Sequence, residues 1–202
     1  LQYKYYLSKC PVLLNHYKAI ATVKARTHKC QSWFLDLNLL LGYWGETTRT
    51  YHHTAPTNSL YALHESLLVL QQEGLENAWA RHQRNHQALK AGLSQLDINF
   101  VVNERDRLPQ LNSIHIPAGL DDKQVRADLL QQHGIEIGAG LGALAGKIWR
   151  IGLMGYSSRV ENVISCLSAL ESVLRQQGMN CPEGIAVAAA YRSYAQQAQQ
   201  TK

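Results

Sequence analysis

The sequence lacks the features that define several broad classes of protein. No window holds the run of apolar residues that a membrane-spanning helix needs, and no basic segment followed by an apolar stretch predicts a secretory leader. The four cysteines are scattered and form no CxxC pair, which argues against a zinc ribbon and gives no disulfide framework. We therefore expect a reducing, cytoplasmic compartment and no membrane partner. An organellar location stays open, although the C-terminal tripeptide is not a peroxisomal signal.

Acidic residues are missing from the first 30 residues, although the chain as a whole is only mildly basic. The 202 residues are 46% hydrophobic and 17% charged, which is typical of a globular protein long enough to bury a core. The net charge is +5, and six Lys or Arg lie in residues 1–30. No nucleic-acid-binding motif accompanies them. We therefore predict no nucleic-acid partner and interpret the basic segment as one edge of a larger domain.

Hydrophobic periodicity predicts helices in the first half of the chain and short strands alternating with helices in the second half. A helix with Asp121 or Asp122 at its N-terminus and Gly134 at its end is especially well marked. This order indicates an α+β arrangement, in which a small mixed sheet has helices on one side. The predicted helices are 19–29, 32–41, 58–71, 75–96, 121–133, 158–178 and a final segment from 184, and the predicted strands are 98–102, 111–116, 135–137 and 147–153.

Two histidines stand one helical turn apart on the helix predicted after Gly74. At positions i and i+4, His82 and His86 have the spacing that lets two imidazoles share a metal ion. A metal site needs a third ligand, and the sequence places none there. Their position on an apolar stripe favours a hydrogen-bonded role in the core, and we predict no metal site.

The glycine-rich segment 138–147 does not fit either common nucleotide-binding motif. A P-loop needs a glycine at the position of Leu141 and a Ser or Thr at that of Ile148, and a dinucleotide-binding loop needs a helix directly afterwards. A strand-like run, KIWRIGL, follows instead. The glycines therefore indicate a loop that lies close to a substrate or to another chain segment.

The KIWRIGL run places an arginine at the centre of an apolar strand. Alternation puts Trp149, Ile151 and Leu153 on one face, and it puts Ile148, Arg150 and Gly152 on the other. A guanidinium buried without an anion is costly, and its fork matches a carboxylate with two parallel hydrogen bonds. On the pattern alone, a protein carboxylate and a ligand carboxylate are equally good partners for this arginine.

A loop rich in threonine and histidine, GYWGETTRTYHHTAPTN, interrupts the helical pattern of the first half. Tyr51 and Thr54 place two hydroxyl groups on either side of His52 and His53, a chemistry that suits phosphate oxygens. The residues by themselves favour a packed tyrosine and a turn threonine over a phosphate site.

Seven segments in a fixed order give the chain a specific resemblance: SWFLDLN, GYWG, RTYHHTAP, SLYALHESL, EGLENAWARH, IEIGAGLG and GKIWRIGLMG. From about residue 19 to residue 176, the chain resembles the C-terminal portion of a class V aminotransferase of the alanine:glyoxylate and serine:pyruvate group. The resemblance implies an α/β protein of PLP fold type I, a pyridoxal 5'-phosphate cofactor and a homodimer with a shared active site. It also implies an altered or truncated remnant of the large domain over 1–18, the helical end of that domain with interdomain helices over 19–96, and a small α+β domain over 97–202.

The resemblance also implies roles for individual residues. Arg150, in WRIG, would hold the α-carboxylate of the amino-acid substrate. Tyr51 and Thr54, in YHHT, would reach the cofactor phosphate of the neighbouring subunit, and residues 42–45 (GYWG) would line the approach. Lys4 is the nearest candidate for the lysine that holds the cofactor as a Schiff base, although the Pro-Pro-Gly turn that follows this lysine in the family is absent here.

The function implied by the resemblance is transfer of an amino group from alanine or serine to glyoxylate or another small 2-oxo acid. The cofactor-binding parts of the large domain are not in this chain, so we expect the isolated chain to be inactive. An alternative is a non-catalytic remnant that only dimerises or binds a partner through its leucine-rich helices. A lyase or desulfurase ranks lower, because it needs a mobile nucleophilic cysteine and the 138–146 loop has none.

Overall fold

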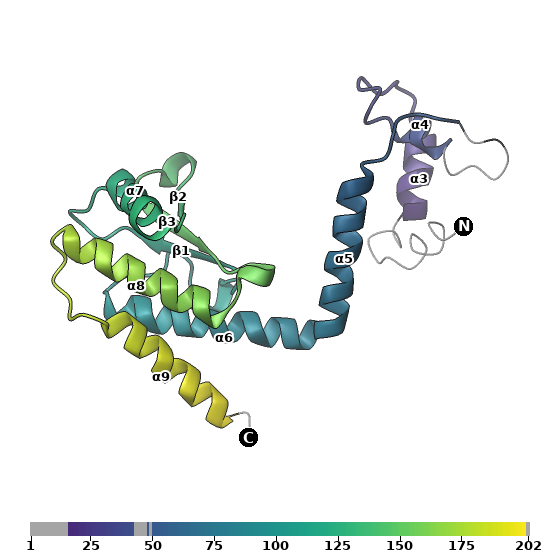
Figure 1. The fold of residues 1–202 in the computed structure, drawn as a ribbon. Coiled ribbons are helices and arrows are strands. Elements are labelled where there is room, and N and C mark those ends of the chain that lie inside the picture. Colours follow the sequence, from purple (N-terminus) through teal and green to yellow (C-terminus); the bar gives the residue numbers. More distant parts are fainter. Residues whose placement is uncertain (1–15, 43–47, 49, 201–202) are drawn as a thin grey trace. The chain divides into compact units, whose positions relative to one another are not determined.

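The computed structural model describes residues 16–42, 48 and 50–200. The chain forms two compact units, one ending at His64 and the other beginning at Glu65, and each is described by itself (Figure 1). The divisions 1–18, 19–96 and 97–202, which follow from the family resemblance, stay predictions.

The described part of the first unit holds two short helices and the start of a long one. Of the helix predicted over 32–41 only the last turn forms, because the Asp36 side chain accepts a hydrogen bond from the Asn38 N–H (3.0 Å) and caps the helix there. The Asn38 side chain donates in turn to the carbonyl of Val23 (3.3 Å). The helix predicted over 19–29 begins earlier and ends at Lys24. The three helices are α3 (His16–Lys24), α4 (Leu37–Leu41) and α5 (Thr57–Glu73), of which α5 continues into the second unit.

The second unit is built on α6 (Leu75–Gln95), which follows α5 after a break at Gly74 with a φ of 83°. A left-handed backbone is cheap for glycine, so the long helical sequence breaks at this point and the helices predicted on either side of Gly74 are confirmed. The α7 helix (Asp122–His133) begins after Asp121, whose side chain accepts from the Gln124 N–H, and ends at a left-handed Gly134, as predicted. The other helical elements described in the unit are α8 (Val160–Gln176), α9 (Ile185–Gln200) and 3-10 turns at 104–106, 142–144 and 155–157.

The sheet has three strands, β1 (Leu111–His115), β2 (Gly138–Ala139) and β3 (Ile148–Gly152), in the order β1-β3-β2. Both pairings are antiparallel, so the prediction of a mixed sheet was wrong. The strand predicted over 98–102 contributes only an isolated bridge between Phe100 and Ile114. The strand predicted over 135–137 is also wrong, because the Ile135 N–H bonds back to the carbonyl of Leu129 and closes the end of α7.

The two faces of the sheet differ in burial, as the alternation in KIWRIGL predicted. Trp149 and Ile151 on β3, with Ile114 on β1, belong to a core shared with α6, α7 and α8. On the other face, burial decreases along the strand: Ile148 is buried, Arg150 is half-buried and Gly152 is exposed. The helices therefore seal one face of the sheet and leave Arg150 on the face that they do not cover.

The α9 helix packs against α6 through small residues (Figure 1). Gly92 is buried in α6, where an added Cβ would lie 2.4 Å from the Leu167 side chain and 3.0 Å from the Ala186 carbonyl. The buried Glu171 carboxylate on α8 accepts hydrogen bonds from the N–H groups of Gly184 and Ala186, and so caps the start of α9. The helix-prone tail predicted from the sequence is thus a packed element of the second unit.

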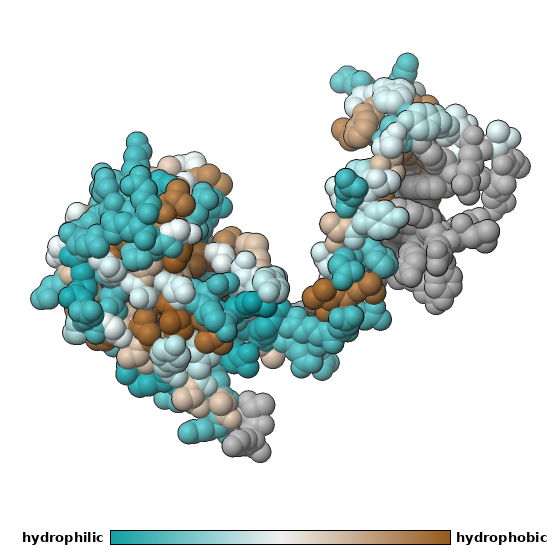
Figure 2. All heavy atoms as spheres, viewed as in Figure 1, coloured by the Kyte–Doolittle hydropathy of each residue, from teal (hydrophilic) through white to brown (hydrophobic). Residues whose placement is uncertain are grey.

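Apolar side chains on α5 remain uncovered. No residue of this helix is buried, and hydrophobic side chains gather at its C-terminal end (Figure 2). Leu63, Leu67 and Val69 are each more than half exposed. Within the described part of the chain, no helix has the length and apolar character to cross a membrane.

Candidate functional site

Arg150 occupies the centre of the uncovered face of the sheet. On β3 it pairs with Ser113 of β1 on one side and with Gly138 of β2 on the other. Its Nε donates a hydrogen bond to the carbonyl of Ala139 (2.8 Å), which lays the side chain along β2. Gly138 makes this possible, because an added Cβ there would lie 3.3 Å from Nη2 and 3.4 Å from Nε of the arginine.

The guanidinium of Arg150 has no carboxylate partner among the residues that the structure describes. The ion pairs of this part of the chain join other residues, and the bond to Ala139 uses one of the five N–H donors of the side chain. An added Cβ at the neighbouring Gly152 would meet nothing within 4 Å. A half-buried, charged fork with unused donors and open space beside it is suited to an anion from outside the chain.

The strand that carries Arg150 is anchored from its buried side. The Trp149 indole donates to the Asp122 carboxylate (2.9 Å), which also accepts from Nε and Nη2 of Arg126. The hydrogen bond from Arg126 is the main reason that the pKa of Asp122 lies below its ordinary value, and the Trp149 bond acts in the same direction. Sequence reasoning marked Asp122 only as a possible helix cap. The sequence indicated only that Asp122 lies in the first turn of a helix. It could not show that its carboxylate bonds to Trp149 on a strand far along the chain.

The loop after β3 is held by polar side chains of α6. Arg81 forms a two-point ion pair with Glu73 and donates from Nη1 to the carbonyls of Gly155 and Ser158, both at 2.8 Å. The Asn85 amide donates to the Ser158 hydroxyl (3.0 Å). These bonds fix the exit of the strand, and sequence periodicity gave no sign of them because α6 reads as an ordinary amphipathic helix.

The histidines of α6 take part in the same framework and are core residues, as predicted. Nδ1 of His82 lies 2.6 Å from the Ala78 carbonyl, and its Nε2 accepts from the Gly155 N–H, so Nδ1 carries the proton. Nδ1 of His86 lies 2.6 Å from the side-chain oxygen of Asn112, and burial lowers the pKa of this imidazole. Among the described residues, no group of three potential ligands surrounds either ring.

The hydroxyls of Tyr51 and Thr54 converge in the loop before α5. The two oxygens lie 2.8 Å apart and share a hydrogen bond, and both residues are exposed. The structure therefore differs from the packed tyrosine that the residues alone favoured, since Tyr51 is 71% exposed. Two adjacent hydroxyls on an exposed loop provide donors for an oxyanion such as a phosphate ester. At the start of this loop, the Thr50 N–H donates a hydrogen bond to the carbonyl of Gly42 (3.1 Å).

Two aromatic residues and two histidines pack together beside these hydroxyls. The Trp33 ring lies over His52 with centroids 4.1 Å apart, and the Phe34 ring lies 4.6 Å from His53. The two histidines are joined by a 2.7 Å hydrogen bond between their Nδ1 atoms. Sequence reasoning placed the two histidines in a loop but did not pair them with each other.

Several predicted site residues lie outside the described part of the chain. These are Lys4 and residues 43–45 of the GYWG segment, and their proposed roles stay predictions. The described cysteines are free, and burial raises the pKa of the Cys166 thiol to about 11. Cys166 is therefore not the reactive thiolate that a desulfurase would need.

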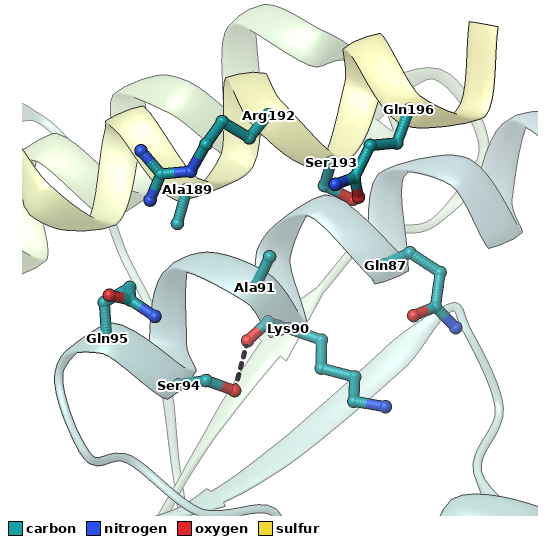
Figure 3. A pocket seen from close by; sticks show the side chains of 9 residues that line it. All are labelled: Gln87, Lys90, Ala91, Ser94, Gln95, Ala189, Arg192, Ser193 and Gln196. Atoms are coloured by element: carbon teal, nitrogen blue, oxygen red, sulfur yellow. Dashed lines mark hydrogen bonds between the residues drawn. The ribbon is translucent and has the colours of Figure 1, made fainter. Parts of the chain in front are cut away.

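A polar groove of about 330 Å³ lies between α6 and α9 (Figure 3). Lys90 and Arg192 line it together with glutamine and serine side chains. Lys90 is ion-paired with Glu104, and the Ser94 hydroxyl donates to the Lys90 carbonyl (2.8 Å). The Lys90 ammonium group is therefore already paired within the chain.

Comparison with known proteins identifies the family. A family model described as "Aminotransferase class-V" matches residues 36–163. The chain is 42% identical over 161 residues to the (S)-ureidoglycine–glyoxylate transaminase of Bacillus subtilis (strain 168), covering 80% of this chain and 38% of the relative. It is 38% identical over 164 residues to the alanine–glyoxylate aminotransferase of Callithrix jacchus, covering 80% of this chain and 39% of the relative. The chain thus spans about two fifths of the length of these relatives.

Solved structures show the same relationship. The alanine–glyoxylate aminotransferase from Nostoc sp. is 50% identical, with a TM-score of 0.73 over 78% of this chain and 41% of that chain. The ureidoglycine–glyoxylate aminotransferase from Bacillus subtilis is 40% identical, with a TM-score of 0.83 over 89% of this chain and 46% of that chain. The described residues thus form part of an aminotransferase fold, which confirms the fold class. Because the family match covers more than half of the sequence, the chain belongs to the class-V aminotransferase family, whose cofactor is pyridoxal 5'-phosphate.

Proposed function

We propose that the protein containing this chain is a transaminase that moves an amino group from alanine or serine to glyoxylate or another small 2-oxo acid. The observation that carries the proposal is Arg150, a half-buried arginine whose guanidinium has no carboxylate partner among the described residues. The relatives that use glyoxylate support the choice of acceptor. Since this chain spans only part of those relatives, the activity belongs to the assembled protein.

In this proposal, Arg150 binds and orients the substrate. Its remaining N–H donors form a two-point contact with the α-carboxylate, which every small amino acid and 2-oxo acid carries. The contact leaves the substrate side chain free and turns the Cα–H bond toward the base that removes its proton. The bond from Nε to the Ala139 carbonyl sets the direction of the guanidinium before substrate arrives.

Tyr51 and Thr54 are proposed to bind the cofactor phosphate of the neighbouring subunit. Their hydroxyls lie 2.8 Å apart on an exposed loop, an arrangement that fits a phosphate ester, whose oxygens accept hydrogen bonds. When bound, pyridoxal 5'-phosphate supplies an electron sink for the charge left at Cα. Lys4 is proposed as the residue that holds the cofactor and moves the proton at Cα, an assignment that rests on family resemblance alone.

The proposal includes a homodimer with shared active sites. The exposed apolar side chains of α5 support it, since a helix with no buried residue but several exposed leucines needs a covering surface. The phosphate contact also crosses between subunits in this arrangement. A cytoplasmic location stays a prediction.

The test joins the full 202-residue chain behind the upstream part of the Bacillus subtilis relative and measures cofactor absorbance and steady-state kinetics. We expect Arg150→Leu to raise the KM for alanine and for glyoxylate by about 100-fold, because a desolvated two-point charged contact is lost. The KM of Arg150→Lys should lie between those of the parent protein and Arg150→Leu, since an ammonium group keeps the charge but cannot form the two-point contact. Arg105→Leu is the control, because that side chain is 85% exposed.

Two outcomes would contradict the proposal. An unchanged KM in Arg150→Leu would remove the substrate-binding role of this arginine. Failure of the joined protein to bind cofactor at all, with both units folded, would favour the alternative of a non-catalytic remnant that only dimerises or binds a partner.

A further inference from the structure

The histidine next to Tyr51 is buried with one ring nitrogen unpaired. His52 is 6% exposed, although the other residues from 50 to 56 are exposed or half-buried. Its Nδ1 bonds to Nδ1 of His53, whereas its Nε2 is buried and has no hydrogen-bond partner in the described part of the chain. A buried polar atom without a partner loses its hydrogen bonds to water and forms none within the protein, which costs free energy. Such atoms are rare in folded proteins, so this one needs an explanation.

The unpaired Nε2 determines the direction of the hydrogen bond between the two histidines. A hydrogen bond between two Nδ1 atoms needs a proton on one ring and a lone pair on the other. If Nε2 of His52 carried the proton, an N–H donor would be buried without an acceptor, and orphaned N–H groups are rarer than orphaned acceptors. Nδ1 of His52 therefore carries the proton and donates to His53.

This donation fixes the backbone that carries the two hydroxyls. His52 and His53 lie between Tyr51 and Thr54 in the sequence, so the angle between their rings constrains the chain that connects the two hydroxyl residues. The His52 ring is also held by the Trp33 ring at a centroid distance of 4.1 Å. A ring held on one side by the Trp33 contact and on the other by a hydrogen bond has little freedom to turn.

We propose that His52 is a positioning residue for the phosphate-binding loop, acting through the hydrogen bond that its Nδ1–H donates to His53. The proposal rests on the proposed function of Tyr51 and Thr54. His52 itself does not touch the phosphate, because its Nε2 is buried and its Nδ1 is engaged. Its effect reaches the cofactor only through the placement of the two hydroxyls.

Three substitutions at His52 separate the parts of this proposal. His52→Asn keeps an amide donor where Nδ1 stands and loses Nε2. His52→Gln places its amide near the Nε2 position and loses the donor at Nδ1. His52→Phe keeps a ring against Trp33 but removes both nitrogens. An exposed histidine at the end of α7 provides the control, His133→Phe.

The measurement is the dissociation constant for pyridoxal 5'-phosphate and for pyridoxal, which lacks the phosphate, in the joined protein described above. We expect His52→Gln and His52→Phe to weaken binding of the phosphate form by about tenfold, the usual effect of one lost hydrogen bond, and to leave pyridoxal binding unchanged. His52→Asn should stay within about threefold of the parent protein. A purely structural role would weaken both ligands together.

A second readout does not depend on the cofactor. Nitrogen NMR of the imidazoles in the full chain should show a proton on Nδ1 of His52 and none on its Nε2. A proton on Nε2 would overturn the proposal. So would the reverse order of variants, with His52→Gln tolerated and His52→Asn impaired, since that order would indicate a direct contact from Nε2.

Failure of this inference can be told from failure of the proposed function. Tyr51→Phe and Thr54→Val are expected to reduce the preference for the phosphate form over pyridoxal. If they do so while all three His52 variants have no effect, only the role of His52 is wrong. If neither hydroxyl variant changes the preference, the phosphate site itself is wrong.

Discussion

Arg150 lies on a strand whose other face is sealed by the core, whereas Tyr51 and Thr54 lie in a loop whose only buried side chain among residues 50–56 is His52. Many buried contacts hold the strand in place, among them those of the fully buried Trp149. The loop owes its position to a few specific pairs, such as the stack of Trp33 on His52. The comparison indicates that the substrate contact is rigid by packing, while the phosphate contact depends on individual hydrogen bonds and ring contacts.

The strongest test of this difference between the strand and the loop is to remove one tryptophan from each region. Trp149→Ala should lower the free energy of unfolding of the second unit by about 3–5 kcal/mol, because a fully buried ring leaves a cavity. Trp33→Ala should cost the first unit about 1 kcal/mol, since its ring is 59% exposed and loses mainly one stacking contact. Hydrogen exchange followed by mass spectrometry reports each unit separately. Equal losses of protection in the two units would contradict the comparison.

A smaller effect is expected from one methyl group placed beside the arginine. Gly138→Ala puts a Cβ within 3.4 Å of the Arg150 guanidinium and should turn that side chain away from its position. We expect the KM for both substrates to rise by about tenfold with little change in stability, because the backbone at 138 needs no glycine-specific angle. Gly152→Ala is the matched control, since its Cβ would meet nothing within 4 Å. An equal rise in KM in both variants would show that the effect does not come from the contact with Arg150.

The smallest expected effect concerns the acid sensitivity of the strand. Hydrogen bonds from Arg126 and Trp149 hold the pKa of Asp122 below its ordinary value of 3.8. A carboxylate with a lowered pKa in the folded state contributes stability that is complete above pH 3.8 and is lost as the pH falls through its folded pKa. The stability of the second unit should therefore decrease below about pH 3.8, and Asp122→Asn should make that decrease shallower. Urea unfolding at a series of pH values measures it, and parallel curves for the two proteins would contradict the assignment.

Much of the framework could be predicted from the sequence because it depends on local pattern. The helix over 121–133 was readable from Asp121 and Gly134, whose capping roles need only neighbouring backbone groups. The alternation along KIWRIGL placed Trp149 and Arg150 on opposite faces for the same reason, since strand period does not depend on partners. The segment predicted as a strand over 98–102 does bond to β1 through two backbone hydrogen bonds, but it forms only a single bridge there. The strand predicted over 135–137 failed because strand formation needs unused backbone hydrogen-bonding groups. Ile135 had already used its N–H to close α7.

The candidate site was readable only in part. Periodicity singled out Arg150 and the family resemblance gave it a role, but only the structure shows that no described carboxylate lies beside its guanidinium. The structure also differs from the packed Tyr51 that the residues alone favoured, because this side chain is exposed and bonded to Thr54. The pair of Nδ1 atoms in His52 and His53 could not be foreseen, because two adjacent histidines can turn their rings in many ways.

The sequence by itself determined the family, the helical boundaries set by glycine and aspartate, and the face of the strand on which Arg150 stands. These properties follow from residue spacing and from contacts within a few positions along the chain. Only the tertiary structure decided that the arginine faces open space, that Asp122 anchors the strand through Trp149, and that His52 is buried beside two exposed hydroxyls. Those properties depend on contacts between side chains that are far apart in the sequence, and the packing of the whole fold determines these contacts.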